Sequence, residues 1–270
     1  MTNKKILVPV DFTGLSEKVT EQAAFLCEMA GASMVLLHIT DKSSDSVSAQ
    51  VKLNEKAGEI SSKYHFHCAG KVREGSIFKD IQAEAEENDY MLVAIGTHGV
   101  RGLKQKLLGS DILKVITKVP APVLVIQSTA SQRLGFNKII LPVATHLAYE
   151  NILIAVVFIG KMFDSEVHIY SIERPGFEWP EMLKKNLEKT KAIFDANGIR
   201  YIRVNEKQTV LSVGFAIQTL QYAKKAGADL IAMMSVSSEE YHYFAQQDKE
   251  NLLTNDSGIP VLCASNAGKG

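Results

Sequence analysis

The sequence has no long hydrophobic run and no surplus of charge of either sign. Its longest apolar run, residues 152–159, is eight residues long, whereas a membrane-spanning helix needs about twenty. Thirty basic residues balance thirty acidic ones, so no net field draws the chain to DNA, RNA or an anionic membrane. Neither a nucleic acid nor a membrane is therefore expected as a partner.

Cysteine is also scarce, and the amino terminus lacks the apolar segment of a signal peptide. Cys27, Cys68 and Cys263 cannot all pair, and none belongs to a CxxC motif. Only five residues separate the lysines near the amino terminus from Asp11, too few for the apolar region of a secretory signal. Both features favour a reducing cytoplasm.

Recognisable catalytic and metal-binding motifs are missing as well. The sequence contains no GxSxG, HExxH, Walker GKS or Walker GKT motif. His65 and His67 are expected on one face of a strand with Cys68 on the other, but no second cluster supplies the three or four converging ligands that zinc needs. We therefore predict no metal site and assign no catalytic residue.

The sequence does contain an internal repeat. Residues 5–10 read KILVPV and residues 138–143 read KIILPV, so that Pro142 is the counterpart of Pro9. Residues 122–127 (PVLVIQ) return as residues 260–265 (PVLCAS). The two offsets, 133 and 138 residues, differ by only five, and such self-similarity indicates repeated structural units. We predict one domain at residues 1–128, a polar linker at residues 129–136 and a second domain at residues 137–270.

Strand and helix patterns alternate along both copies. Strands are predicted at residues 5–10, 33–39, 66–72, 91–95 and 122–127, and again at residues 138–143, 167–171, 199–204, 229–234 and 260–264, with helical stripes between most of them. This alternation indicates two tandem doubly wound α/β domains, each with a five-stranded parallel sheet flanked by helices. Residues 152–159 are apolar on every side, so we expect that helix to be buried on more than one face, either between domains or subunits or deep within one domain.

A glycine-rich segment follows the fourth predicted strand. Gly96, Gly99, Gly109 and Ser110 are spaced as G-x2-G-x9-G-S. Open α/β sheets bind ligands at the carboxyl ends of their strands. Glycines there let backbone amides approach an anion and adopt positive φ, and the amino terminus of the next helix suits a phosphate. The pattern predicts anion binding.

Plainer interpretations of these residues stay open. Glycines at a strand end commonly mark only a turn, and loop cations such as Arg101 are usually solvated. Asp11, directly after the first strand, has the position of a helix cap or turn residue.

Together with ILVPVD at residues 6–11 and APVLVIQ at residues 121–127, this segment resembles the universal stress protein family, whose fold is adenine nucleotide alpha hydrolase-like. The resemblance implies ATP as cofactor, possibly with Mg2+. It places Asp11 beside the adenine or ribose, Ile39 against adenine, and Pro9 and Val10 on the base side. Residues implied to wrap the ribose and phosphates are Gly96, Thr97, His98, Gly99, Arg101, Gly109, Ser110 and Asp111.

The second copy departs from this pattern. Met234, Ser237 and Gln247 stand where the three glycines would be, and Asp248 replaces the serine. A carboxylate at a phosphate position opposes anion binding. Ala144 replaces Asp11. The second copy is therefore not expected to hold ATP.

These observations lead to a functional hypothesis. The chain is expected to be a cytoplasmic, ATP-binding stress-response protein with an unidentified protein partner. The resemblance further implies that the two final strands associate, giving an intramolecular pseudo-dimer, and that a homodimer can form. Two alternatives stay open: slow ATP hydrolysis or phosphoryl transfer with Mg2+ and Asp11 or His98, and an interaction scaffold that binds no nucleotide.

Overall fold

The computed structural model describes residues 4–41, 45–97, 109–131, 135–173, 176, 178–208, 215–236 and 246–266. The first half contains β1 (Lys5–Pro9), α1 (Gly14–Ala30), β2 (Ser33–Thr40), α2 (Ser46–Tyr64), β3 (Cys68–Glu74), α3 (Ile77–Glu87), β4 (Leu92–Gly96), α4 (Gly109–Ile116) and β5 (Val123–Ile126). The second half contains β6 (Lys138–Pro142), α5 (Glu150–Phe163), β7 (Glu166–Glu173), α6 (Glu181–Asn197), β8 (Arg200–Lys207), α7 (Ala216–Ala226), β9 (Leu230–Met234), α8 (Gln246–Leu253) and β10 (Val261–Ala264).

The strands of these residues form one continuous sheet with the order β3-β2-β1-β4-β5-β10-β9-β6-β7-β8. Neighbouring strands are parallel within each half. β5 and β10 are antiparallel, with Leu124 opposite Leu262. The predicted fold class, a doubly wound α/β arrangement with five parallel strands in each half, is confirmed. The two final strands are the pair that joins the halves.

The sequence repeat corresponds to a repeat in local structure. α1 begins with a capping box between Thr13 and Ser16, and it ends at Gly31, which adopts the left-handed conformation. α5 ends in the same conformation at Asp164, which is the counterpart of Gly31 when Pro9 is aligned with Pro142. The first helix of each half therefore ends at the same point of the repeat.

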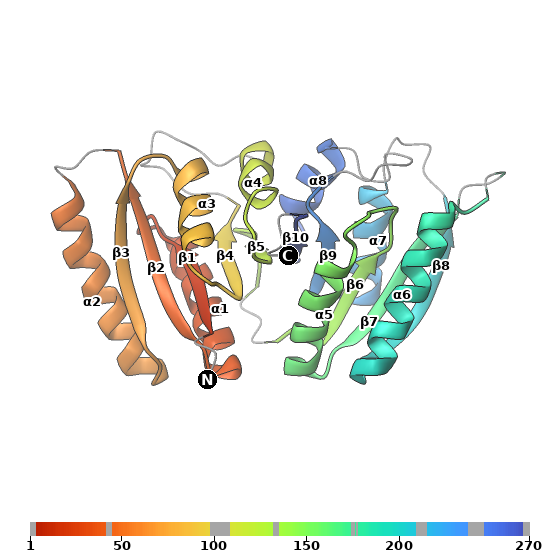
Figure 1. Ribbon diagram of the computed structural model, residues 1–270, viewed down its shortest axis with the longest axis horizontal. Coiled ribbons are helices and arrows are strands. Elements are labelled where there is room, and N and C mark those ends of the chain that lie inside the picture. The colour runs from red at the N-terminus through yellow and green to blue at the C-terminus, as the bar shows by residue number, and fades with distance from the viewer. Residues whose placement is uncertain are drawn as a thin grey trace.

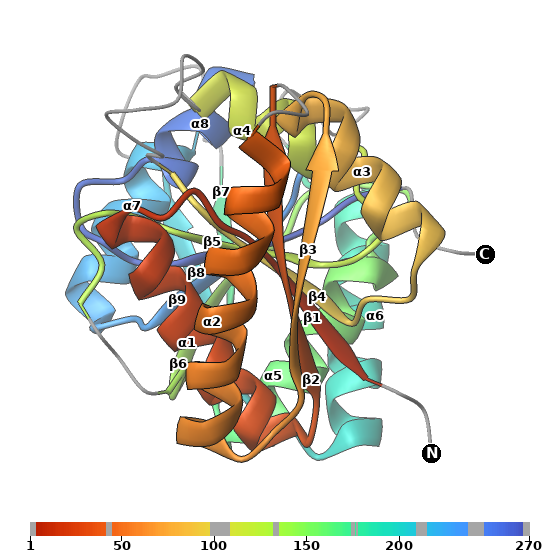
Figure 2. The same cartoon turned by 90° about the vertical axis from the view of Figure 1, so that its left-hand side faces the viewer.

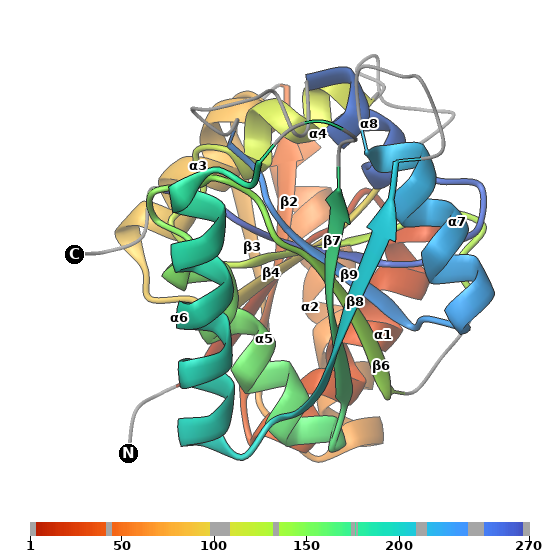
Figure 3. The same cartoon turned by 90° about the vertical axis from the view of Figure 1, so that its right-hand side faces the viewer.

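Helices cover both faces of the sheet. In the first half, α1 and α2 lie on the opposite face from α3 (Figure 2), as right-handed crossovers between parallel strands require. In the second half, α5 and α6 lie opposite α7 (Figure 3). α4 and α8 pack side by side where the halves meet (Figure 1). Within the described ranges, no helix is long and apolar enough to span a bilayer.

One helix was not predicted, one local expectation is wrong, and one apolar helix has an exposed side in the single chain. The short helix α8 forms over a polar segment that the apolar pattern does not predict. His65 does not lie in a strand: it ends α2 with a φ of 58°, and β3 begins only at Cys68. The apolar helix α5 is not covered on every side, because Ile154 is 65% exposed while Ile152 and Leu153 are buried.

Candidate functional site

A cleft lies at the carboxyl ends of β1 and β4. These strands are neighbours, and the chain leaves them in opposite directions, from β1 toward β2 and from β4 toward β5. Open α/β sheets bind ligands at such a switch point. The topology of the sheet therefore places a cleft at the edge where such folds bind ligands.

Five residues singled out from the sequence line this cleft together. They are Pro9, Val10, Asp11, Ile39 and Gly96. They come from the ends of β1, β2 and β4 and from the turn after β1, which are far apart in the sequence. The order of the strands, with β1 between β2 and β4, brings them to one place.

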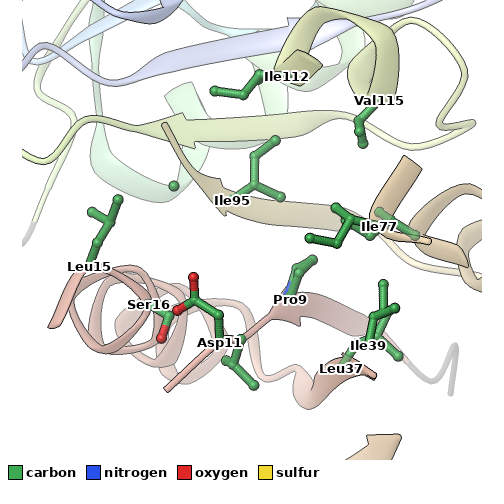
Figure 4. Close-up of a pocket in the computed structure, with 13 residues that line it drawn as sticks. Pro9, Asp11, Leu15, Ser16, Leu37, Ile39, Ile77, Ile95, Ile112 and Val115 are labelled. Carbon is green, nitrogen blue, oxygen red and sulfur yellow. The ribbon is translucent and has the colours of Figure 1, made fainter. Parts of the chain in front are cut away.

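The helices supply walls that the sequence reasoning missed. Ile77 and Ile81 line the cleft from α3. Ile112 and Val115 line it from α4 (Figure 4). The spacing of each pair, four residues and three residues, puts its members on one helix face, which was the available signal. Branched aliphatic walls of this kind suit a flat aromatic ring, and a few polar groups then fix the orientation of the ring.

Asp11 supplies the carboxylate of the cleft, and Thr13 holds it. One oxygen of Asp11 accepts hydrogen bonds from the backbone N–H of Thr13, at 3.1 Å, and from the Thr13 hydroxyl, at 2.5 Å. Thr13 in turn caps α1 through Ser16, whose side chain also lines the cleft beside Asp11 (Figure 4). Asp11 is therefore a turn residue and also faces the cleft, so the two interpretations of its position are compatible.

A glycine is required at position 96 by close packing, and not by the positive φ that was expected. Its backbone does not adopt a positive φ. A Cβ atom at this position would lie 2.8 Å from both Cγ and Cδ2 of Leu15, closer than real carbon atoms approach. The residue lets β4 pack directly against α1, and the expectation of a positive φ at Gly96 is wrong.

The other predicted site residues lie directly after β4, in the first turn of α4, or outside the described residues. Thr97 is buried, and its backbone N–H donates to the carbonyl of Ile126. Asp111, in the first turn of α4, pairs with Lys114 at 3.1 Å. Gly109 and Ser110 begin α4. His98, Gly99 and Arg101 lie outside the described residues.

Larger side chains occupy the equivalent positions of the second half. In the alignment that pairs Pro9 with Pro142, Tyr149 replaces Ser16 and Tyr170 replaces Leu37. Both tyrosines are fully buried, and the Tyr149 hydroxyl donates to the carbonyl of Pro142 at 3.3 Å. Ala144, at the position of Asp11, has no carboxylate. Two positions that line the cleft in the first half therefore carry larger, buried side chains in the second half.

One helix of the cleft also connects the two halves. α4 faces the cleft through Ile112, and the carbonyl of Ile116 accepts a hydrogen bond from the hydroxyl of Ser235 at 3.3 Å. The Ser235 carbonyl accepts in turn from Nζ of Lys249 at 3.1 Å. Burial lowers the pKa of Lys249 to about 8. A buried lysine on α8 is thus linked by two hydrogen bonds to the helix that lines the cleft.

Comparisons with known proteins agree with this architecture. Residues 2–127 match the model of the Universal stress protein family, so this part of the chain carries a domain of that family. No curated protein sequence matches the chain.

Solved structures are similar to this chain over nearly its whole length. A universal stress protein from Archaeoglobus fulgidus DSM 4304 is 20% identical, with a TM-score of 0.74, over 98% of this chain and 99% of that one. A functionally unknown protein from Pseudomonas aeruginosa PAO1 is 16% identical, with a TM-score of 0.65, over 98% and 93%. At these identities the likeness shows the fold alone.

Proposed function

We propose that this chain is a tandem protein of the universal stress type that binds ATP in the cleft of its first half. In this proposal the second half binds no nucleotide and presents surface to a protein partner. The chain acts as a nucleotide-dependent module in the response to stress. The family match of residues 2–127 supports the proposal, and so does the resemblance of the loop after β4.

One observation carries the proposal: residues that the resemblance assigns to adenine and ribose line a single cleft. Pro9, Asp11 and Ile39 meet there although β1 and β2 are separated by a whole helix. The walls from α3 and α4 are aliphatic and suit the faces of a purine ring. The Asp11 carboxylate is an acceptor suited to ribose hydroxyls or to the amino group of adenine.

The difference between the halves supports a single nucleotide site. Ala144 cannot accept a hydrogen bond through its side chain, and Tyr149 and Tyr170 are large buried residues at positions that line the cleft in the first half. One ATP per chain is therefore expected.

The test is calorimetric titration of the purified protein with MgATP. We expect a stoichiometry of one ATP per chain, and roughly tenfold weaker binding for Asp11→Ala, because hydrogen bonds to a charged group contribute about 1.5–3 kcal/mol. The matched control is Asp256→Ala, since Asp256 is exposed and lies outside the cleft. Equal affinity of Asp11→Ala and the unchanged protein would contradict the proposed role of Asp11, and no binding by the unchanged protein would contradict the function. Phosphate release, measured in the same samples, separates binding from hydrolysis.

A further inference from the structure

His38, on β2, forms a hydrogen bond to the turn between β1 and α1. Nδ1 of His38 lies 2.7 Å from the carbonyl oxygen of Val10. A carbonyl oxygen can only accept, so Nδ1 carries the hydrogen atom and donates. Val10 directly precedes Asp11. The hydrogen bond therefore fixes the peptide unit from which the carboxylate of the cleft projects.

His38 also contacts the residue on the other side of Asp11. Phe12 has a φ of 59°, in the left-handed region that residues other than glycine rarely adopt. Its ring packs against the imidazole of His38, with the ring centroids 4.7 Å apart and the planes at 45°. The imidazole thus touches both neighbours of Asp11, one by a hydrogen bond and one by ring packing.

The second half forms the same strand pairing without this contact. The N–H of Val143 donates to the carbonyl of Tyr170 at 2.9 Å, as the N–H of Val10 donates to that of Leu37 at 2.8 Å. Ser171 stands at the position of His38, and its hydroxyl is directed at the neighbouring strand β8, 3.4 Å from the Val204 carbonyl oxygen.

A different residue holds the turn of the second half. Asn186 of α6 donates to the carbonyls of Ala144 and His146, at 2.7 and 3.0 Å. The fold therefore accepts other ways of fixing this turn. The imidazole occurs in the half that carries the carboxylate, and serine occurs in the half that carries Ala144.

From this contrast we infer that His38 is a positioning residue of the nucleotide site. Its Nδ1–H holds the Val10 peptide so that the Asp11 carboxylate faces the ligand, while Thr13 fixes one carboxylate oxygen. The inference rests on the proposed function, because it concerns the orientation of a group in the ATP cleft.

The inference is tested by three replacements of His38. They differ in where the side chain carries an N–H group that can donate a hydrogen bond. Asn keeps an N–H near the position of Nδ1, Gln carries its N–H one bond further out, and Leu has no donor. We expect His38→Asn to bind MgATP about as tightly as the unchanged protein, and His38→Gln and His38→Leu to bind roughly tenfold more weakly, which is the effect of losing one hydrogen bond. Calorimetric titration gives the affinities, and Ser171→Leu is the matched control with unchanged affinity.

The possible results separate this inference from the proposed function. If the unchanged protein binds MgATP and His38→Gln and His38→Leu bind equally well, the inference is overturned and the proposed function stands. Equal weakening in all three variants also overturns it, because the loss would then follow the ring and not the donor. If the unchanged protein does not bind MgATP, the proposed function itself fails. Should His38→Leu not fold, the comparison of His38→Asn with His38→Gln decides the question.

Discussion

Ser16 and Tyr149 occupy equivalent positions of the two halves, and they differ in whether they leave space beside the sheet. Ser16 lines the cleft of the first half, whereas the ring of Tyr149 is fully buried and its hydroxyl bonds to Pro142. The side chain at this position is small where it lines the cleft of the first half, and large and buried in the second half.

Ser16→Tyr should therefore close the first cleft. We expect MgATP affinity to fall by more than about tenfold, because a buried aromatic side chain takes the volume of a ligand ring. The control is Ser16→Ala, which loses the same capping contact but leaves the cleft open. Calorimetric titration of both variants, with melting temperatures to verify folding, gives the answer, and equal affinities for the two would contradict it.

Gly96→Ala should destabilise the fold through a clash with Leu15. The added carbon would lie 2.8 Å from Cγ and Cδ2 of Leu15, and overpacking of this kind costs about 1–3 kcal/mol. We expect the double variant with Leu15→Ala to show less than the sum of the two losses, because the smaller residue removes the clash. Urea denaturation of the four proteins measures this coupling. Strict additivity would show that the contact does not explain the glycine.

Glu84 should contribute stability that is lost in acid. Its carboxylate is 1% exposed and lies 2.6 Å from Nζ of Lys71 and 2.8 Å from Nη1 of Arg73, and the Tyr90 hydroxyl donates to it at 2.9 Å. Burial alone would raise the pKa of Glu84, but the hydrogen bonds from Lys71, Arg73 and Tyr90 outweigh burial, so the folded pKa lies below its usual value.

A lowered folded pKa means that the contribution of Glu84 is complete above the unfolded pKa of about 4.3 and declines as the pH falls through the folded value. Glu84→Gln removes the buried charge but leaves Arg73 paired with Asp80 and Glu87, so it should cost about 1.5–3 kcal/mol at pH 7. The loss should shrink as the pH falls further. Denaturant titrations across this range check both statements, with Glu86→Gln as the exposed control. A loss at pH 7 no greater than that of the control would contradict the assignment.

Lys249 should make stability rise with pH in the alkaline range. Burial lowers its folded pKa to about 8, from 10.5, so between these values the unfolded chain binds the proton and the folded chain does not. Stability contributed by this group therefore increases from about pH 8 upward. Lys249→Met, which is uncharged, should flatten this rise, and denaturant titration between pH 7 and about 9.5 measures it. The same slope in both proteins would show that Lys249 is not its source.

An element could be predicted from the sequence where its own residues carry the signal, such as an apolar run or a glycine at a helix end. The apolar strands and the left-handed end of α1 at Gly31 are of this kind. α8 was not predictable in this way, because its segment, QQDKENLL, is mostly polar and becomes a helix where it packs against α4 and α7.

The residues of the candidate site also fall into two groups, those that the sequence could identify and those that it could not. Residues at strand ends, such as Asp11, could be identified because parallel strands place their carboxyl ends at one edge. Ile77 and Ile112 line the cleft because α3 and α4 are rotated toward it, and the rotation of a helix depends on the surface below it. The role inferred for His38 depends on a hydrogen bond from β2 to the turn after β1, for which the local sequence has no pattern.

The antiparallel pairing of β5 with β10 decides how the chain behaves when it is divided. In the intact sheet only β3 and β8 end the order of strands, so the hydrogen-bonding groups of β5 and β10 are satisfied by each other. A fragment holding either half alone would present one of these strands as a bare, apolar edge, and such edges pair with any strand available. Separated halves should consequently associate with copies of themselves. In the intact protein β5 and β10 belong to one chain, so they pair with each other before either edge meets a strand of another molecule.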